Sequence, residues 1–309
     1  MAIATRILCE PYAGLRSQGL GLAEAAELPA EACVLAPKLP WRLAPARIWL
    51  RPLAAVGLRP PWPDLAIGVG GVAAAVGAAL RSRGVRAVQV QHPRMRLDRF
   101  DLVVAARHDG ISGPNVLVTR TALHRVTPQR LAAAAAEWRD RLAYLPRPLV
   151  AVLVGGTNGR FRLDVPAASV FAAELAHMAR RDRVGLAVTP SRRTGQAAMA
   201  ALATALAPEG AYVWDGQGEN PYFGLLGLAD AIVVTIDSVS MISEAVATPA
   251  PVMLAPLPGR SRRSRLLVDV LARCGRVRPF VGRFQHWRVA PLNDTAEAAS
   301  QMRRRLGLD

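Results

Sequence analysis

Six consecutive apolar residues, Leu149–Val154, stand between Pro148 and the pair Gly155-Gly156. The run is too short for a buried helix, and it has no polar residue that could face water. It therefore predicts a strand covered on both faces, which is typical of a parallel sheet with helices on either side. Short apolar runs of this kind recur along the chain and alternate with helical stretches, which indicates βαβ units.

The pattern predicts an α/β protein with two Rossmann-like domains. In the first half we expect strands at Thr5–Cys9, Ala32–Leu35, Leu65–Gly68, Ala87–Val90, Leu102–Ala105 and Val116–Val118. In the second half we expect strands at Leu149–Val154, Val184–Thr189, Ala211–Trp214, Ala231–Thr235 and Pro251–Leu254. A helix over Ala167–Arg180 should turn Val170, Phe171, Leu175 and Met178 inward.

The boundary between the domains is predicted from a helix and two prolines. The helix spans Pro128–Ala143, and Pro146 and Pro148 then make a stiff break. This divides the chain into an acceptor-side domain, residues 1–145, and a nucleotide-binding domain, residues 146–309. The last helix, from Thr295, is expected to pack back on the first domain.

The chain carries 39 basic and 23 acidic residues, a net charge of +16, and Lys38 is the only lysine. An arginine skew beside abundant alanine, glycine and proline fits a GC-rich genome better than selection for a ligand. Three scattered cysteines argue against a disulfide framework or a zinc site, so no metal and no cofactor are expected. The absence of a long apolar span or leader predicts a cytoplasmic protein, with peripheral association at the inner membrane as an alternative.

Ligands of open parallel sheets bind outside the carboxyl ends of the strands, so the loops after strands are the candidate site. The first is Gly155, Gly156, Thr157 and Asn158, which we interpret as an anion cradle or, alternatively, as a tight turn. The second is Ser191, Arg192, Arg193 and Thr194, whose arginines could clamp a phosphate or simply be solvated.

The third loop is the strongest candidate. Asp237, Ser238 and Ser240 precede or open a helix whose N-terminus favours anions, and Glu244 lies in its second turn. We predict that Glu244 accepts hydrogen bonds from a ribose; the alternative is an exposed charge beside capping serines. Asn220 caps a neighbouring helix, and Tyr222 could stack on a base.

In the first half, Gly14 and Gln18 are expected in a polar acceptor-side loop, Pro11–Gln18. His92 and His108 follow predicted strands, and either could be a catalytic base, with Asp109 orienting His108. The alternative for each is a turn or capping residue.

A basic segment, Arg260 to Arg288, holds nine arginines against Asp269. It predicts contact with an anion, either the phosphates of a nucleotide or an anionic membrane surface. Few aromatic residues interleave with these arginines, which argues against nucleic acid as a partner.

Several motifs resemble the mitochondrial-fission ELM (elongated mitochondria) family, which has bacterial members. The most distinctive are Ser191-Arg192-Arg193-Thr194, Asn220-Pro221-Tyr222-Phe223, and the run Thr235 to Met241 with Glu244. Plant members recruit a dynamin-like division protein to mitochondria. The second half is also similar to the donor half of GT-B glycosyltransferases, although Met241 stands where those enzymes usually have threonine.

The resemblance implies a GT-B-like fold, with two sheets facing across a cleft, and a nucleotide-sugar-binding, glycosyltransferase-like protein. In such enzymes the helix N-terminus holds the pyrophosphate and the glutamate holds the ribose. The competing interpretation is a non-enzymatic adaptor that recruits a partner or binds a membrane. The sequence predicts no oligomeric state.

Overall fold

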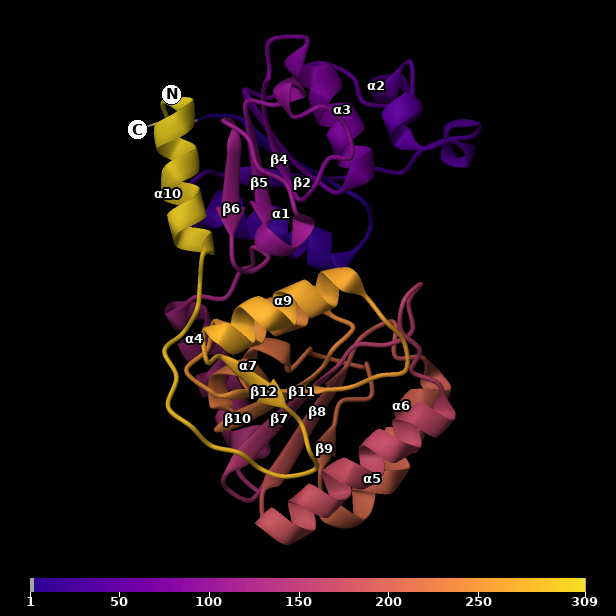
Figure 1. The fold of residues 1–309 in the computed structure, drawn as a ribbon, viewed down its shortest axis with the longest axis vertical. Coiled ribbons are helices and arrows are strands. Elements are labelled where there is room, and N and C mark those ends of the chain that lie inside the picture. The colour runs from indigo at the N-terminus through magenta and orange to yellow at the C-terminus, as the bar shows by residue number, and fades with distance from the viewer. Residues whose placement is uncertain (1–2, 309) are drawn as a thin grey trace. The chain divides into compact units, whose positions relative to one another are not determined.

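The computed structural model describes residues 3–308, which form two compact units. Unit 1 contains residues up to Arg125 together with Asn293 onward, and unit 2 is Val126–Leu292. Each unit contains one six-stranded parallel sheet, as the alternating pattern predicts (Figure 1). Among the described residues, no helix combines the length and apolar character needed to cross a bilayer.

The sheet of unit 1 has the order β2-β1-β3-β4-β5-β6. Its strands are β1 (Thr5–Cys9), β2 (Ala30–Val34), β3 (Leu65–Val69), β4 (Arg86–Val90), β5 (Leu102–Ala106) and β6 (Val116–Thr119). Its helices are α1 (Ala13–Ala25), α2 (Pro52–Ala55), α3 (Gly71–Arg81) and α10 (Thr295–Leu306). Helices α1 and α10 cover one face, and α2 and α3 cover the other.

The sheet of unit 2 has the order β12-β11-β10-β7-β8-β9. Its strands are β7 (Leu149–Val154), β8 (Gly185–Pro190), β9 (Tyr212–Val213), β10 (Ala231–Thr235), β11 (Val252–Ala255) and β12 (Val277–Pro279). Its helices are α4 (Pro128–Arg139), α5 (Val165–Asp182), α6 (Gln196–Leu206), α7 (Tyr222–Leu228), α8 (Val239–Val246) and α9 (Arg262–Arg273).

Alternate residues of β7 enter two different cores, which explains why its apolar run has no polar member. Ala151 and Leu153 pack with residues of α4, α7, α8 and α9, whereas Val150, Val152 and Val154 pack with α5 and α6. The strand is therefore buried on both faces, as its sequence predicts.

Helix α4 belongs to unit 2, whereas the two prolines that follow it predict that it belongs to the first domain. It packs closely on α7, where a Cβ atom on Gly224 would lie 2.5 Å from the Trp138 ring. Leu131 and Trp138 are buried in the core of unit 2. The chain thus divides at Arg125, and the prolines at 146 and 148 only separate α4 from β7.

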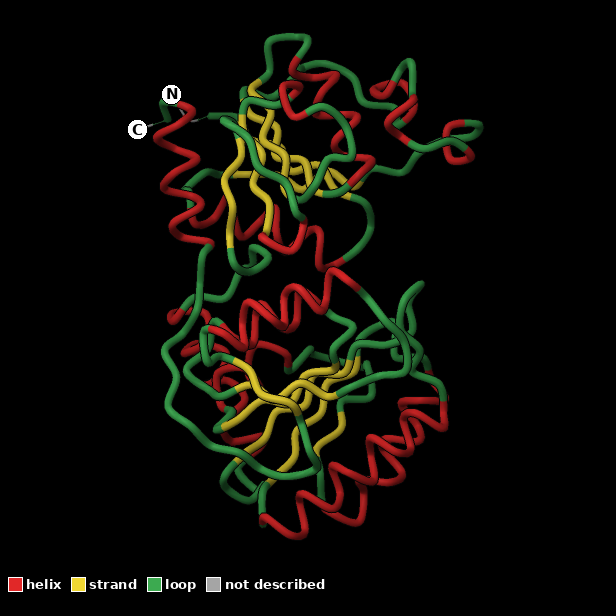
Figure 2. The backbone as a smooth tube through the Cα atoms, viewed as in Figure 1, coloured by secondary structure: helices red, strands yellow, loops and turns green. Residues whose placement is uncertain are grey.

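Helix α10 packs against α1 and belongs to unit 1. The loop 280–294, without helix or strand, carries the chain to it from β12 (Figure 2). The contacts of α10 with the rest of unit 1 include an ion pair between Arg120 and Asp294 and a hydrogen bond from the backbone N–H of His124 to Thr295 Oγ1 at 3.2 Å. Unit 1 is therefore built from both ends of the chain.

Candidate functional site

The strand order of unit 2 reverses between β7 and β10. From β7 the chain moves to β8 and β9, and from β10 it moves the opposite way to β11 and β12. The loops after β7 and β10 therefore leave the carboxyl edge of the sheet side by side. This switch point is where open α/β sheets usually bind ligands, and both predicted loops, 155–158 and 236–238, lie there.

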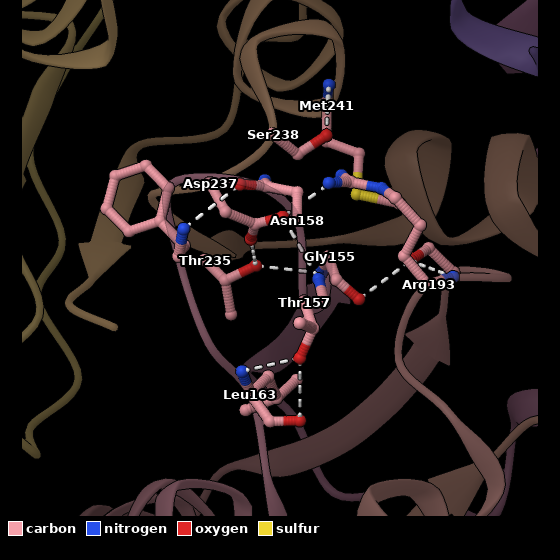
Figure 3. A network of polar contacts seen from close by, with 12 residues as sticks. Gly155, Thr157, Asn158, Leu163, Arg193, Thr235, Asp237, Ser238 and Met241 are labelled. Carbon is pink, nitrogen blue, oxygen red and sulfur yellow. Dashed lines mark hydrogen bonds and ion pairs between the residues drawn. The ribbon is translucent and has the colours of Figure 1, made fainter. Parts of the chain in front are cut away.

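A buried carboxylate joins these loops to a third one (Figure 3). The side chain of Asp237 is fully buried. It accepts hydrogen bonds from Thr235 Oγ1 at 2.7 Å and from the backbone N–H of Gly156 at 3.0 Å. Arg193, from the loop after β8, forms an ion pair with it at 3.0 Å. Asp237 is thus an internal clamp rather than an exposed ligand group.

The two glycines are needed because the loops approach so closely. A Cβ atom on Gly155 would lie 2.1 Å from Asp237 Oδ1, and one on Gly156 would lie 2.1 Å from the Arg193 carbonyl oxygen. Neither position requires a left-handed backbone. The pair therefore provides space for the clamp.

The glycine loop differs from the open anion cradle that its sequence suggests. Its four N–H groups all donate within the protein, from Gly155 to Thr235 Oγ1, Gly156 to Asp237, Thr157 to the Arg193 carbonyl and Asn158 to the Phe161 carbonyl. The side chain of Asn158 accepts from two backbone N–H groups of the same loop. In this conformation the loop is a tight turn whose N–H groups are occupied within the protein.

The loop after β8 combines latching hydroxyls with exposed arginines. Ser191 Oγ and Thr194 Oγ1 both donate to the carbonyl of Gly155, at 2.7 and 2.6 Å. These hydroxyls hold β8 to the loop after β7. Arg192 and Arg193 remain exposed at the same edge, so they are the part of this motif that a ligand could reach.

Helix α8 begins directly beside the clamp. Ser238 is its N-cap and accepts from the backbone N–H of Met241 at 3.5 Å. Ser240 lies in the first turn and is half-buried. The first turn of a helix carries N–H groups without partners in the helix and a partial positive charge, which together favour an anion.

Glu244 is buried, which excludes the exposed-charge alternative. Its residue is 7% exposed, and its Oε2 accepts a hydrogen bond from the hydroxyl of Tyr222 at 2.5 Å. Burial, followed by the charge of Glu244, raises the pKa of Tyr222 well above its usual value, so the hydroxyl remains a donor. Asn220 Oδ1 accepts from the Tyr222 N–H at 3.0 Å, but the N-cap of α7 is Pro221 and not Asn220, because the helix begins at Tyr222.

The hydroxyl role of Tyr222 was not predicted. The sequence suggests only that its ring could stack on a base. The pairing with Glu244 depends on α7 lying beside α8, and the two residues are 22 positions apart in the sequence, too far for a helix or strand period to indicate the contact. A tyrosine at the start of one helix and a lone acid in the next are the only hints.

The basic segment does not form one surface. Its first residues lie at the carboxyl edge, because Arg260 donates from its backbone to the Arg160 carbonyl at 3.0 Å and Gly259 bridges to Phe161. Arg276 is instead buried, and donates to the carbonyls of Thr248 and Ala250 beyond the other end of α8. Burial lowers the pKa of Arg276 to about 10. Arg278 stacks on the ring of Trp287.

In unit 1, the expected polar loop of Gly14 and Gln18 is part of a helix. Both residues lie within α1, which begins at Ala13, and Gln18 is buried. Its Nε2 donates to the Gly14 carbonyl at 3.2 Å, and its Oε1 accepts from Gln91 at 3.0 Å. The hydrogen bond between Gln18 and Gln91 thus connects α1 to the loop after β4.

His92 and His108 lie beyond strand ends, as expected. Asp109 Oδ2 accepts from the backbone N–H of Ala106 at 3.2 Å and so caps its own 3-10 turn. His108 is buried in that turn. His92 is half-buried, and its Nδ1 accepts from the backbone N–H of Arg94 at 2.9 Å.

Among residues 3–308, no three His, Cys, Asp or Glu side chains are grouped so that they could hold a metal ion. The exposed groups of the candidate site are cationic, the N-terminus of α8 favours an anion, and the two acids of the site, Asp237 and Glu244, are buried.

The sequence matches a known protein family. The family described as Mitochondrial fission ELM1 matches residues 13–306. The chain belongs to this family. It is 34% identical over 254 residues to the mitochondrial fission protein ELM1 of Arabidopsis thaliana, covering 74% of this chain and 59% of that protein. The chain thus spans about three fifths of its plant relative.

Solved structures with the same fold include GT-B proteins. MurG of Acinetobacter baumannii superposes with a TM-score of 0.51 at 16% identity, covering 98% of this chain and 90% of that one. The UDP-GlcNAc 2-epimerase of Methanocaldococcus jannaschii, solved with UDP-GlcNAc and UDP, gives 0.55 at 11% identity and covers 99% of both chains. At these identities the likeness establishes the fold of this ELM1-family chain.

Proposed function

We propose that the carboxyl edge of the unit 2 sheet binds a nucleoside diphosphate, as part of a nucleotide sugar, in a glycosyltransferase-like protein. The observation that carries this proposal is Glu244. It is a buried acid, oriented by Tyr222, in the second turn of the helix that starts at the switch point. A buried carboxylate held in this way is suited to a neutral ligand with hydroxyl groups.

The diphosphate would bind in front of that acid. The first turn of α8 offers N–H groups and Ser240, and Arg192 and Arg193 approach from the next loop. Arginine at a helix N-terminus binds phosphate through paired hydrogen bonds and charge. Because the glycine loop is already bonded to Asp237, we assign the phosphates to α8 and the arginines, with loop 155–158 as their support.

The ribose would hydrogen-bond to Glu244. A carboxylate has about four lone-pair sites and can accept more than one hydrogen bond. The ring of Tyr222 adjoins that of Phe223, with centroids 5.6 Å apart, and the pair provides an aromatic surface for a base. The UDP-bound epimerase of the same fold supports a nucleotide as the ligand.

Catalytic residues, if the protein is an enzyme, would come from unit 1. His92 and His108 are the proposed acid or base residues, with Asp109 beside them and Gly14 and Gln18 on the acceptor side. Nδ1 of His92 accepts a hydrogen bond from the backbone N–H of Arg94, so Nε2 is the ring nitrogen that would face a substrate.

A nucleotide panel tests the proposal. Melting of the full chain would be followed with UDP, GDP, ADP and inorganic phosphate. A ligand at 100 times its Kd contributes about 2.7 kcal/mol, which raises the melting temperature by roughly 5 °C or more. We expect UDP or GDP to do so and phosphate alone not to. No response to any nucleotide would favour the adaptor interpretation.

A further inference from the structure

The segment 38–51 of unit 1 exposes an unusual number of large apolar side chains. Leu39, Leu43, Ile48 and Leu50 are 71%, 81%, 61% and 91% exposed. They lie between β2 and α2, in a stretch that stands out from the sheet of unit 1 (Figure 1). Single exposed leucines are ordinary, but four within twelve residues form a patch that needs a partner.

The same segment is strongly cationic. Lys38, Arg42, Arg47 and Arg51 alternate with the exposed apolar residues. No aspartate or glutamate occurs between Glu31 and Asp64. Alternating apolar and basic residues without acids match the surface of an anionic bilayer, where side chains enter the interface and cations meet the phosphates.

The exposed residues are held on a structured support. Trp41 and Trp49 pack edge to face with ring centroids 6.2 Å apart, and Trp49 is buried. Trp49 Nε1 donates to the Ala44 carbonyl at 3.0 Å. Two 3-10 turns, Trp41–Leu43 and Ala46–Ile48, shape the segment. The leucines therefore project from a folded platform.

A cavity of about 850 Å³ adjoins this platform. Trp49 and Leu50 form part of its wall, and four arginines line it against two aspartates: Arg81, Arg86, Arg96, Arg99, Asp98 and Asp101. The excess of positive charge beside the apolar patch extends the surface that an anionic headgroup would meet.

We propose that segment 38–51 docks the protein on an anionic phospholipid bilayer. Leu39, Leu43, Ile48 and Leu50 enter the interface, while the neighbouring cations contact lipid phosphates. A second copy of the chain is a poorer partner, because a two-fold contact would bring the same cations face to face. The proposal does not depend on nucleotide binding in unit 2.

Vesicle flotation of the full chain tests this proposal. Vesicles of phosphatidylcholine alone are compared with vesicles that also contain phosphatidylglycerol. We expect preferential binding to the anionic vesicles, weakened by salt. The double variant Leu43→Ser/Leu50→Ser should lower the partition coefficient by about tenfold or more, because it removes two apolar side chains from the interface.

The matched control is Val170→Ser/Val281→Ser, which removes two valines of unit 2 that are 64% and 65% exposed. It should bind like the parent protein. Equal loss in both variants, or undiminished binding of Leu43→Ser/Leu50→Ser, would place the contact elsewhere and overturn the proposal. Failure of the parent protein to bind either vesicle type would also overturn the proposal. If the parent protein is instead a dimer that Leu43→Ser/Leu50→Ser dissociates, the segment contacts a second copy of the chain and not a bilayer.

Discussion

The two units share one architecture but differ in strand order, and the difference places the candidate site. In unit 2 two strands, β8 and β9, extend the sheet on one side of β7 before β10 pairs with its other side. In unit 1 a single strand, β2, lies on one side of β1 before β3 pairs with its other side. Unit 2 therefore has the dinucleotide-fold order, and unit 1 has the flavodoxin-like order extended by β6. Similar strand patterns thus produce switch points with different neighbours.

The two switch points also differ in what lies there. In unit 2 the loops after β7, β8 and β10 are held together by the buried Asp237 and leave α8 and two arginines at the edge. In unit 1 the corresponding region contains Gln18 and Gln91, joined by an uncharged hydrogen bond. The loops of the two units are therefore joined differently, by a buried ion pair in unit 2 and by a hydrogen bond between two amide side chains in unit 1.

The largest expected effect is on the close packing in unit 2. Gly156→Ala would place a Cβ atom 2.1 Å from the carbonyl oxygen of Arg193, so backbone must move. We expect a loss of about 3–4 kcal/mol in unfolding free energy, measured by denaturant titration with hydrogen exchange to resolve the units. Gly71→Ala in unit 1 meets nothing within 4 Å and should change stability little. Equal effects would contradict the clamp.

A pH effect of similar size is expected in unit 1. Burial lowers the pKa of His124 to about 4, against 6.5 in the unfolded chain. Between pH 6.5 and 4 only the unfolded chain gains this proton, so stability falls with falling pH, by about 3 kcal/mol in total. His124→Gln should flatten that slope, whereas His177→Gln, exposed in unit 2, should not. An unchanged slope in His124→Gln would assign the acid sensitivity to other groups.

A smaller effect separates the two adjacent arginines. Arg193 pairs with the buried Asp237 but is itself 41% exposed, so Arg193→Gln should cost about 1 kcal/mol of stability. Arg192→Gln should leave the melting temperature within error, because that side chain is exposed. Both variants should weaken nucleotide binding. If Arg192→Gln lowers stability and Arg193→Gln does not, Arg192 and not Arg193 is the arginine that stabilises the fold.

Strands with mostly apolar sequences were predictable from the sequence. The bounds of Thr5–Cys9, Leu149–Val154 and Ala231–Thr235 are confirmed without change. Strand β12, Val277–Pro279, was missed because it has three residues, two of them exposed. The start of α1 was placed too late because Gly14 suggested a loop.

Packing directions were predicted less well. Val170 is exposed although Phe171, Leu175 and Met178 are buried. The three buried residues are spaced by four and three and share one helix face, while Val170 lies about 100° from Phe171 around the helix. Apolar character alone did not identify the inward face.

The site was predictable as a set of loops but not as a network. Parallel strands bring their carboxyl ends to one edge, which is why loops 155–158, 191–194 and 236–238 could be grouped. The contacts of Asp237 with Gly156 and of Tyr222 with Glu244 depend on which strands and helices are neighbours. Local sequence does not encode that order.

The most direct measurement is a calorimetric titration of UDP into Glu244→Gln. Glutamine can still accept from Tyr222, so the apo melting temperature should hardly change, while the loss of a charged acceptor should lower affinity by about 1.5–3 kcal/mol, or ten- to a hundredfold. Glu174→Gln, exposed on α5, is the matched control and should bind like the parent. If Glu244→Gln unfolds the protein and folded molecules bind UDP as before, Glu244 is structural and the account of the site is wrong.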